Sequence, residues 1–339
     1  MAWNDWDVSI GGTSRIGQMA DYLLSIDWTD SEGVESDTCR LTFDDSDGQL
    51  ALPPKRAVAT VSRDGVEIYS GVVDSTPWKM TRGGGRVLEV SLKAFDTRGK
   101  AVETQNWHLD DKTLKDALEK AAQNAGVSVT VDHAFAAIER DYWNPLGESF
   151  IAFAERLRRE FGATFKMRGG KEAVFAMRGT GLSPFGQALP TVIGRVPPPG
   201  EETSGNVHSI DIDPTRGRPR SKEKRVTWFD PKAGAFKDKR VTIALDDIGE
   251  AIDTQRWPAA DETQGGTMAS GQKTDAEQDA GVGSVMMEFT PDAFVEGRFQ
   301  LIGARPGIDG TYRIASVSSK ATRDSGGTTN LQLAQPNAG

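Results

Sequence analysis

One stretch decides the class of fold: Val58-Ala59-Thr60-Val61-Ser62-Arg63-Asp64-Gly65-Val66-Glu67-Ile68-Tyr69. Two runs rich in β-branched and aromatic residues flank Asp64-Gly65, a dipeptide that favours a two-residue hairpin turn because both of its residues accept a positive φ. The stretch therefore predicts two antiparallel strands. A barrel or a sandwich built from such strands is expected around it.

The sequence on both sides of this hairpin alternates between apolar and polar residues. The alternating apolar sets are Leu24, Ile26 and Trp28, then Cys39, Leu41 and Phe43, then Leu88, Val90 and Leu92. Period two is typical of strands with one buried face. Gly83-Gly84-Gly85 predicts a further turn before the last of these strands. Residues 1–100 are therefore expected to form a first antiparallel β unit.

The period changes between residues 106 and 178. Apolar residues from Leu114 to Ala125 fall on one helical stripe that ends at Gly126, and a second stripe runs from Phe150 to Phe161. Two short strands, 163–167 and 173–177, follow. Residues 101–205 are thus predicted to be an α+β middle region whose last part, 179–205, is a Pro-rich surface linker containing Pro197-Pro198-Pro199-Gly200.

The last third returns to strands and carries an uneven charge. Strand-like runs separated by glycine turns predict a second β unit over residues 206–339. Residues 215–240 carry ten bases and three acids, a net charge of +7, whereas residues 244–283 carry nine acids and two bases, a net charge of −7. The acidic stretch 244–283 has few large apolar residues, and we expect it to be a mobile insertion that a partner orders.

Composition limits the classes of function. The chain has 339 residues with a formal net charge of −9 and one cysteine. An acidic chain is a poor generic binder of nucleic acid or anionic membranes, and one cysteine excludes an intramolecular disulfide. The sequence has neither a signal peptide pattern nor an apolar run long enough to cross a membrane, so we expect a protein used without a membrane and without sequence-specific nucleic acid.

Histidine and cysteine offer no convincing site. His108, His133 and His208 are far apart in sequence, and none has a second histidine or a carboxylate at a helical metal-ligand spacing. Cys39 alternates with Leu41 and is interpreted as a buried strand thiol, not a nucleophile.

Three loop-like segments also have better structural interpretations. Asp44-Asp45-Ser46-Asp47-Gly48 resembles a calcium loop, but the register places Phe43 and Pro54 at ligand positions. Gly11-Gly12-Thr13-Ser14 and Gly83-Gly84-Gly85 lack the strand–loop–helix setting of a phosphate loop and predict turns. The basic run 216–225 lacks the interleaved aromatic residues of a single-strand binder. No catalytic, cofactor-binding or metal-binding residue is assigned.

The order of several strings resembles the phage late control protein D family, the tail hub proteins of contractile-tailed phages and tailocins. The strings are Ala94-Phe95-Asp96, 113–127, 148–163, Val295-Glu296-Gly297-Arg298 and 307–317. Two features depart from the family pattern: its alanine-rich helix before the closing strands is reduced here to residues 275–280, and Ser318-Ser319 stand where a histidine often follows.

The resemblance implies two tail-tube-like antiparallel β-barrels that flank the α+β region, in a homotrimer. It also implies a structural baseplate hub, a trimeric symmetry adaptor that joins a hexameric tail tube to a trimeric central spike. Tape measure and baseplate wedge proteins are further implied partners. The expected location is the virion baseplate, after assembly in the host cytoplasm. A tail-associated peptidoglycan-degrading enzyme and a DNA-binding late-gene regulator remain alternatives.

Overall fold

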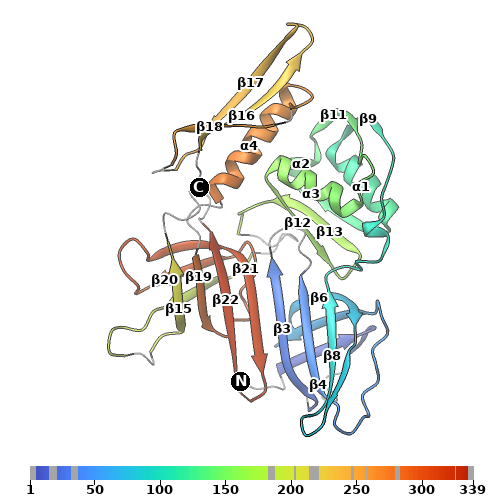
Figure 1. Ribbon diagram of the computed structural model, residues 1–339, viewed down its shortest axis with the longest axis vertical. Coiled ribbons are helices and arrows are strands. Elements are labelled where there is room, and N and C mark those ends of the chain that lie inside the picture. Colours follow the sequence, from blue (N-terminus) through green and yellow to red (C-terminus); the bar gives the residue numbers. More distant parts are fainter. Residues whose placement is uncertain are drawn as a thin grey trace.

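The computed structural model describes residues 5–14, 21–31, 37–181, 188–201, 204–213, 221–245, 248–256, 258–278, 283–324 and 326–334. Two β units lie side by side at one end of an elongated molecule, and the helical part lies above them (Figure 1). The predicted class, a mainly β protein with an α+β middle region between two antiparallel β units, is confirmed. The division of the chain at residues 100 and 205 stays a proposal.

Within the described residues, the first β unit contains eight strands. They are β1 (Trp6–Ile10), β2 (Thr13–Ser14), β3 (Leu23–Ser31), β4 (Thr38–Asp44), β5 (Val58–Arg63), β6 (Val66–Ser75), β7 (Trp78–Thr81) and β8 (Gly85–Lys93). The predicted hairpin at Asp64-Gly65 is present: β5 and β6 pair antiparallel, and both turn residues have positive φ. The alternating apolar residues of β4 and β8 are buried, as are Ile26 and Trp28 of β3, so the period-two pattern identified the inner face there correctly. It was wrong for Leu24: Leu23 is buried instead, because the register of β3 shifts between Leu23 and Ser25.

The second β unit consists of strands from the last part of the chain, together with β14, which precedes residue 200. They are β14 (Thr191–Arg195), β15 (Val207–Ile212), β19 (Gly283–Glu288), β20 (Arg298–Ile302), β21 (Gly310–Thr322) and β22 (Gly326–Ala334). Strand β14 pairs parallel with β20 and buries Val192 in the core of this unit. The prediction of a linker throughout 179–205 is therefore wrong for residues 191–195, where the alternation of buried Val192 and Gly194 was overlooked.

A single pairing fuses the two β units into one sheet. The long strand β21 pairs with β22 on one side and, over Ser316–Thr322, with β3 on the other. Ala321 of β21 is fully buried in the core of the first unit. Phe289, just after β19, meets Trp28 of β3 edge-to-face at a centroid distance of 5.4 Å and also contacts Trp6. The second unit therefore completes part of the core of the first unit.

The middle region packs helices against a small sheet. Its elements are η2 (Lys100–Val102), β9 (Leu109–Thr113), α1 (Leu114–Ala125), β10 (Ser128–Val131), α2 (His133–Ala136), β11 (Glu139–Trp143), α3 (Phe150–Phe161), β12 (Ala163–Arg168) and β13 (Glu172–Met177). Thr113 and Asp116 form a capping box at the start of α1, and Gly126 ends it in the left-handed conformation. Both predicted helices are confirmed. Strands β9 and β11, here called the ribbon, were not predicted.

The described residues of the basic and acidic segments form a projection, here called the arm. It consists of β16 (Ser221–Asp230), β17 (Ala235–Thr242), β18 (Ala251–Thr254) and α4 (Glu262–Gln278). The expectation of a mobile acidic insertion is wrong for residues 262–278, which form α4 against β16 and α3. The helix before the closing strands is likewise not reduced to residues 275–280. Helix α4 was not predicted because its many Gly, Ser and Thr residues give it a weak helix propensity and a weak apolar periodicity.

Phe289→Ala should weaken the contact between the two β units. The substitution removes an aromatic side chain that packs between Trp6 and Trp28, so we expect the free energy of unfolding to fall by roughly 2–3 kcal/mol. Chemical denaturation followed by tryptophan fluorescence measures this. The matched control is Phe236→Ala, because Phe236 is 68% exposed. It should change the free energy of unfolding by less than about 1 kcal/mol. Equal losses in the two variants would contradict the shared core.

Candidate assembly interface

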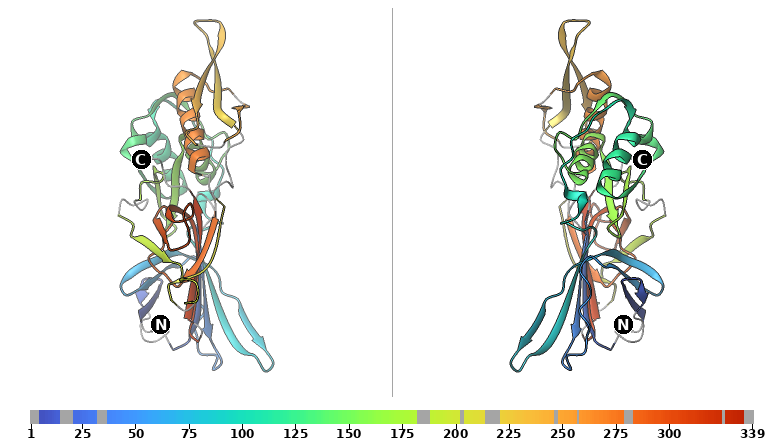
Figure 2. Two further views of the ribbon diagram at one scale, coloured as in Figure 1. Left: turned by 90° about the vertical axis from the view of Figure 1, so that its left-hand side faces the viewer. Right: turned by 90° about the vertical axis from the view of Figure 1, so that its right-hand side faces the viewer.

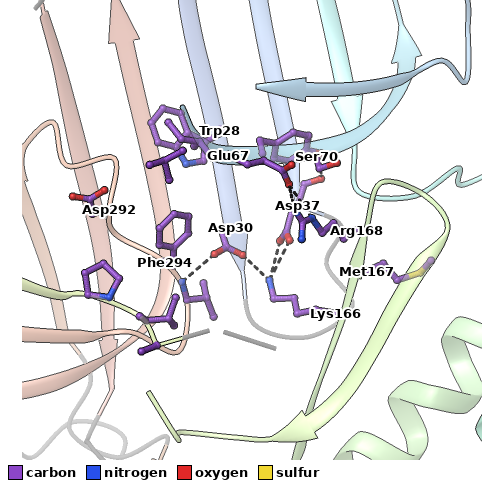
Figure 3. A pocket seen from close by; sticks show the side chains of 17 residues that line it. Trp28, Asp30, Asp37, Glu67, Ser70, Lys166, Met167, Arg168, Asp292 and Phe294 are labelled. Carbon is purple, nitrogen blue, oxygen red and sulfur yellow. Dashed lines mark hydrogen bonds and ion pairs between the residues drawn. The ribbon is translucent and has the colours of Figure 1, made fainter. Parts of the chain in front are cut away.

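A buried lysine joins three parts of the molecule. Lys166 of β12 points out of the middle region, and its Nζ donates hydrogen bonds to Asp30 Oδ1 at 2.7 Å and to Asp37 Oδ1 at 3.1 Å, as well as to the carbonyl of Ser31. Asp30 Oδ2 in turn accepts a hydrogen bond of 2.9 Å from the backbone N–H of Val295 in the second β unit. Lys166, Asp30 and Asp37, here called the ion cluster, therefore fix the positions of both β units and the middle region (Figure 3).

The ion cluster holds two carboxylates against one ammonium group in a poorly solvated place. Burial, and after it the charge of Asp30, raise the pKa of the Asp37 carboxyl to about 7 from an ordinary value of 3.8. Burial opposes the charge of Lys166, but Asp30 and Asp37 outweigh it, so the pKa of Lys166 is raised. When Asp37 is protonated, the negative charge of Asp30 balances the positive charge of Lys166, and the ion cluster is neutral. Near neutral pH, the protonation state of Asp37 therefore responds to small changes in its surroundings.

A cavity of about 490 Å³ adjoins the ion cluster. Trp28, Tyr69 and Phe294 supply its apolar wall, and Glu67 and Arg168 lie on its rim as an ion pair. Figure 3 shows Lys166 and Arg168 reaching across from β12 toward the carboxylates of the first β unit. The hydroxyl of Tyr69 donates to the backbone carbonyl of Asp37 at 2.7 Å, which further orders this corner. The polar groups of the cavity thus face one another across the contact between units.

The arm is attached to the middle region through two glycines. Gly162 ends α3, and Gly271 lies in α4 where the two helices touch. A Cβ on Gly271 would lie 2.5 Å from the carbonyl oxygen of Glu160 and 2.9 Å from the backbone nitrogen of Gly162. Only glycine allows this approach. The position of the arm is therefore set by backbone contact.

Polar contacts reinforce this attachment. Arg178, after β13, donates to Asp275 of α4 at 2.7 Å, and the Arg178 side chain is only 5% exposed. Gln264 of α4 donates to the carboxylate of Glu160, which also pairs with Arg140 of β11. Because these groups are mostly buried, rotation of the arm would leave them without partners, at a cost of about 1–3 kcal/mol each.

The structure places the sequence candidates at separate positions. His108 is exposed and stacks on Tyr142, His133 is exposed beside Asp132, and His208 is exposed on β15. Cys39 is buried, as predicted, and burial raises the pKa of its thiol. Among the described residues, no group of three or more His, Cys, Asp or Glu side chains could hold a metal ion.

The loop candidates are turns. Asp44 accepts hydrogen bonds from the backbone and hydroxyl of Ser46, which closes the turn before Gly48. Gly11-Gly12 joins β1 to β2, and the Gly83–Gly85 segment lies at the turn between β7 and β8. Residues 216–220 of the basic run lie outside the described residues, and Lys222, Lys224 and Arg225 lie on β16.

The basic and acidic segments pair with each other. Strand β18 of the acidic segment runs parallel to β16 of the basic segment, and Lys224 Nζ lies 2.6 Å from Asp253. The acidic stretch was expected to be ordered by a partner, and the basic segment of the same chain supplies part of that partner. The ion cluster was not predicted from the sequence, where its signal was a lysine, Lys166, in an otherwise buried strand pattern.

Comparisons with known proteins place this fold among tail proteins. No family model matches the chain. The chain is 26% identical over 196 residues to the probable baseplate hub protein of Escherichia phage P2, covering 56% of this chain and 49% of the relative. It is also 26% identical over 175 residues to the probable baseplate hub protein of Escherichia phage 186. The chain thus spans about half the length of the curated relatives that it matches.

Solved structures match over the whole chain. A 43 kDa tail protein of prophage MuSo2 from Shewanella oneidensis has a TM-score of 0.69 at 16% identity, with 98% of each chain covered. The E. coli c3393 protein, a component of the type VI secretion system, has a TM-score of 0.59 at 13% identity, with 98% of this chain and 77% of that chain covered. Fold and sequence agree on the class: this chain resembles phage baseplate hub and tail proteins, as its sequence predicted.

Asp37→Asn should remove a pH dependence of stability. The pKa of Asp37 is higher in the folded chain than in the unfolded chain, so between about pH 4 and pH 7 the folded chain keeps a proton that the unfolded chain has lost. The free energy of unfolding therefore falls as the pH rises through this window. The asparagine variant should lose this slope and exceed the parent in stability at pH 8.

Chemical denaturation at half-unit pH steps measures the slope. Asp47→Asn, at an exposed carboxylate in the same unit, is the matched control and should keep the parental profile. An unchanged slope in Asp37→Asn would show that the ion cluster does not control it.

Gly271→Ala should detach the arm. A methyl group there collides with backbone atoms of Glu160 and Gly162, and neither atom can rotate away. We expect a loss of stability of about 1–3 kcal/mol and faster hydrogen exchange in α4. Gly266→Ala is the control, because nothing lies within 4 Å of its added Cβ, and it should be neutral or slightly stabilising. Similar exchange rates for α4 in both variants would rule out the glycine contact.

Proposed function

We propose that this chain is a structural baseplate hub, a homotrimeric symmetry adaptor that joins a hexameric tail tube to a trimeric central spike. The observation that carries the proposal is the fold match over 98% of the chain to a phage tail protein, combined with two β units in one continuous sheet. Three copies with two β units each would present six units to six tube subunits. The proposed location is the baseplate of the virion, after assembly in the host cytoplasm.

Exposed strand edges and hairpins supply the contacts that this role needs. The β7–β8 hairpin extends away from the body at the end opposite the arm (Figure 2). It exposes Trp78 and Met80, which are 47% and 60% exposed, on successive outward positions of β7. Exposed aromatic and methionine side chains are enriched in protein interfaces. The tube, the spike, the tape measure protein and the baseplate wedge are the proposed partners of such surfaces.

The enzyme alternative has one specific observation in its favour. Asp37 has a raised pKa and borders a cavity, which is the setting of a catalytic acid. However, Lys166 contacts both Asp37 and Asp30, and Asp30 also holds the backbone of Val295. The carboxylates are thus occupied by contacts between units, whereas a glycosidase needs its two carboxylates directed at a substrate. We infer a structural role for the cluster and for the chain.

The DNA-binding alternative is weakened by the charge of the arm. Lys224, Arg225 and Lys237 on the arm each lie in an ion pair with an aspartate of the same projection. The basic segment therefore presents less positive charge than its sequence suggests. Binding to phosphates depends on free cations and falls with salt.

The mass of the purified protein tests the trimer. The chain is 36.6 kDa, so light scattering should give about 110 kDa for the chain alone, or a larger complex containing three copies once spike and tube proteins are added. A chain that stays monomeric and does not bind those partners would overturn the proposal. Peptidoglycan clearing by the parent chain, lost in Asp37→Asn, would instead support the enzyme.

A further inference from the structure

The cavity beside the ion cluster, here called the junction cavity, combines a buried aromatic side with an exposed apolar rim. Trp28 and Tyr69 line it and are only 3% and 6% exposed, and the half-buried ring of Phe294 lines it as well. On the rim, Val66 is 51% exposed and Pro190 is also exposed. Its volume of about 490 Å³ lies within the roughly 300–1,000 Å³ that is typical of ligand sites.

The lining of the junction cavity is acidic. Among the described residues, four acids and two bases line it, a net charge of −2 when all six are ionised; they are Asp30, Asp37, Glu67, Asp292, Lys166 and Arg168 (Figure 3). Each base has an acid as its partner: Arg168 pairs with Glu67, and Lys166 pairs with Asp30. The cavity therefore has more carboxylates than bases.

Two of these carboxylates have no base of their own. Asp37 shares Lys166 with Asp30, whereas Asp292 is exposed and lies in no ion pair within the described part of the chain. The side chains of Asp30 and Asp37 remain 23% and 17% exposed, so a ligand can reach them. Burial raises the pKa of Asp37, because an ionised carboxylate without a full counter-charge is costly in a poorly solvated place. A bound cation would remove that cost.

Aromatic rings beside carboxylates select an organic cation. A guanidinium group is flat, stacks on aromatic faces and can bind a carboxylate through two parallel hydrogen bonds. The apolar rim favours a ligand that also carries apolar groups around its cation. An arginine within a short protein segment has both properties, because its apolar stem lies between the guanidinium group and the neighbouring residues of the segment.

We propose that the junction cavity binds an arginine side chain of a partner protein, with the guanidinium group beside Asp37 and the residues that flank the arginine on the apolar rim. Charge complementarity with the acidic lining selects this occupant. Because both β units and the middle region line the cavity, the bound segment contacts all three. The site lies within one chain, so the inference goes beyond the proposed trimer and does not depend on it.

Isothermal titration of the full-length chain with capped arginine tests the site. The probes are acetyl-arginine amide, acetyl-citrulline amide, in which a neutral urea group replaces the guanidinium group, and the tripeptide acetyl-leucyl-arginyl-leucine amide. We expect the citrulline probe to bind at least about tenfold more weakly than the arginine probe, because it lacks the cation. The tripeptide should bind at least about fivefold more tightly than capped arginine, because its leucines bury apolar surface on the rim.

The pH dependence of binding gives a second readout. The titratable groups packed around Asp37 are Asp30 of β3, Lys166 of β12 and Tyr69 of β6. The pKa of Asp37 is about 7, and the guanidinium group must displace its proton, so the dissociation constant should fall about tenfold from pH 6 to pH 8.

Three variants of the full-length chain assign the binding to the cavity. Asp37→Asn should weaken binding of the arginine probe and abolish its pH dependence. Asp292→Asn, at an exposed side chain on the lining, should weaken binding and keep the pH dependence. The matched control is Asp47→Asn, at an exposed carboxylate outside the lining, and it should bind like the parent.

Separate outcomes contradict separate parts of the inference. Equal affinity for the arginine and citrulline probes, or parental affinity in both Asp37→Asn and Asp292→Asn, would overturn the cation site. A tripeptide that binds no more tightly than capped arginine would overturn the partner segment and indicate a free small cation instead. The titrations give these results whether the chain is a monomer or a trimer, so they are distinct from a failure of the proposed hub.

Discussion

The pairing of β3 with β21 is the constraint on which the rest of the structure depends. The two strands are almost 300 residues apart in sequence, yet seven residue pairs join them in antiparallel register. This pairing turns two β units into one sheet and brings Phe289 against Trp28. Because a shift of the register by one residue would exchange the buried and exposed faces, the two units have one permitted orientation. The symmetry adaptor that we propose needs this fixed relation.

The middle region and the arm are also held in fixed positions by specific contacts. The ion cluster ties β12 to both β units, and the contact of Gly162 with Gly271 ties the arm to the middle region. Both connections depend on close geometry. The ion cluster depends on the balance of charge between Lys166 and two aspartates, and the arm depends on backbone contact between two glycines. Surfaces held in this way, such as the Phe229–Phe236 face, keep fixed directions relative to the β units.

Sequence patterns predicted the parts of this fold that rest on local rules. The Asp64-Gly65 hairpin, the capped helix from Leu114 and the alternating strands followed from turn chemistry, capping and period. Strand β14 and helix α4 did not, because β14 is stabilised by a parallel partner about 100 residues away and α4 by glycine contact with α3. The ion cluster was also beyond prediction: Asp30, Asp37 and Lys166 meet only after three units have packed. Resemblance to tail hub proteins supplied the class of protein, which local rules did not, but none of these three features.

The claim that this chain is a baseplate hub is tested most directly on assembled particles. A short epitope tag at an exposed turn, such as Pro231–Gly234 at the tip of the arm, can be labelled with gold and located by electron microscopy. The account predicts label at the baseplate end of the tail in every intact particle, and averaged images with threefold symmetry at that level. Label along the whole tail, or tagged protein found only outside purified particles, would contradict it.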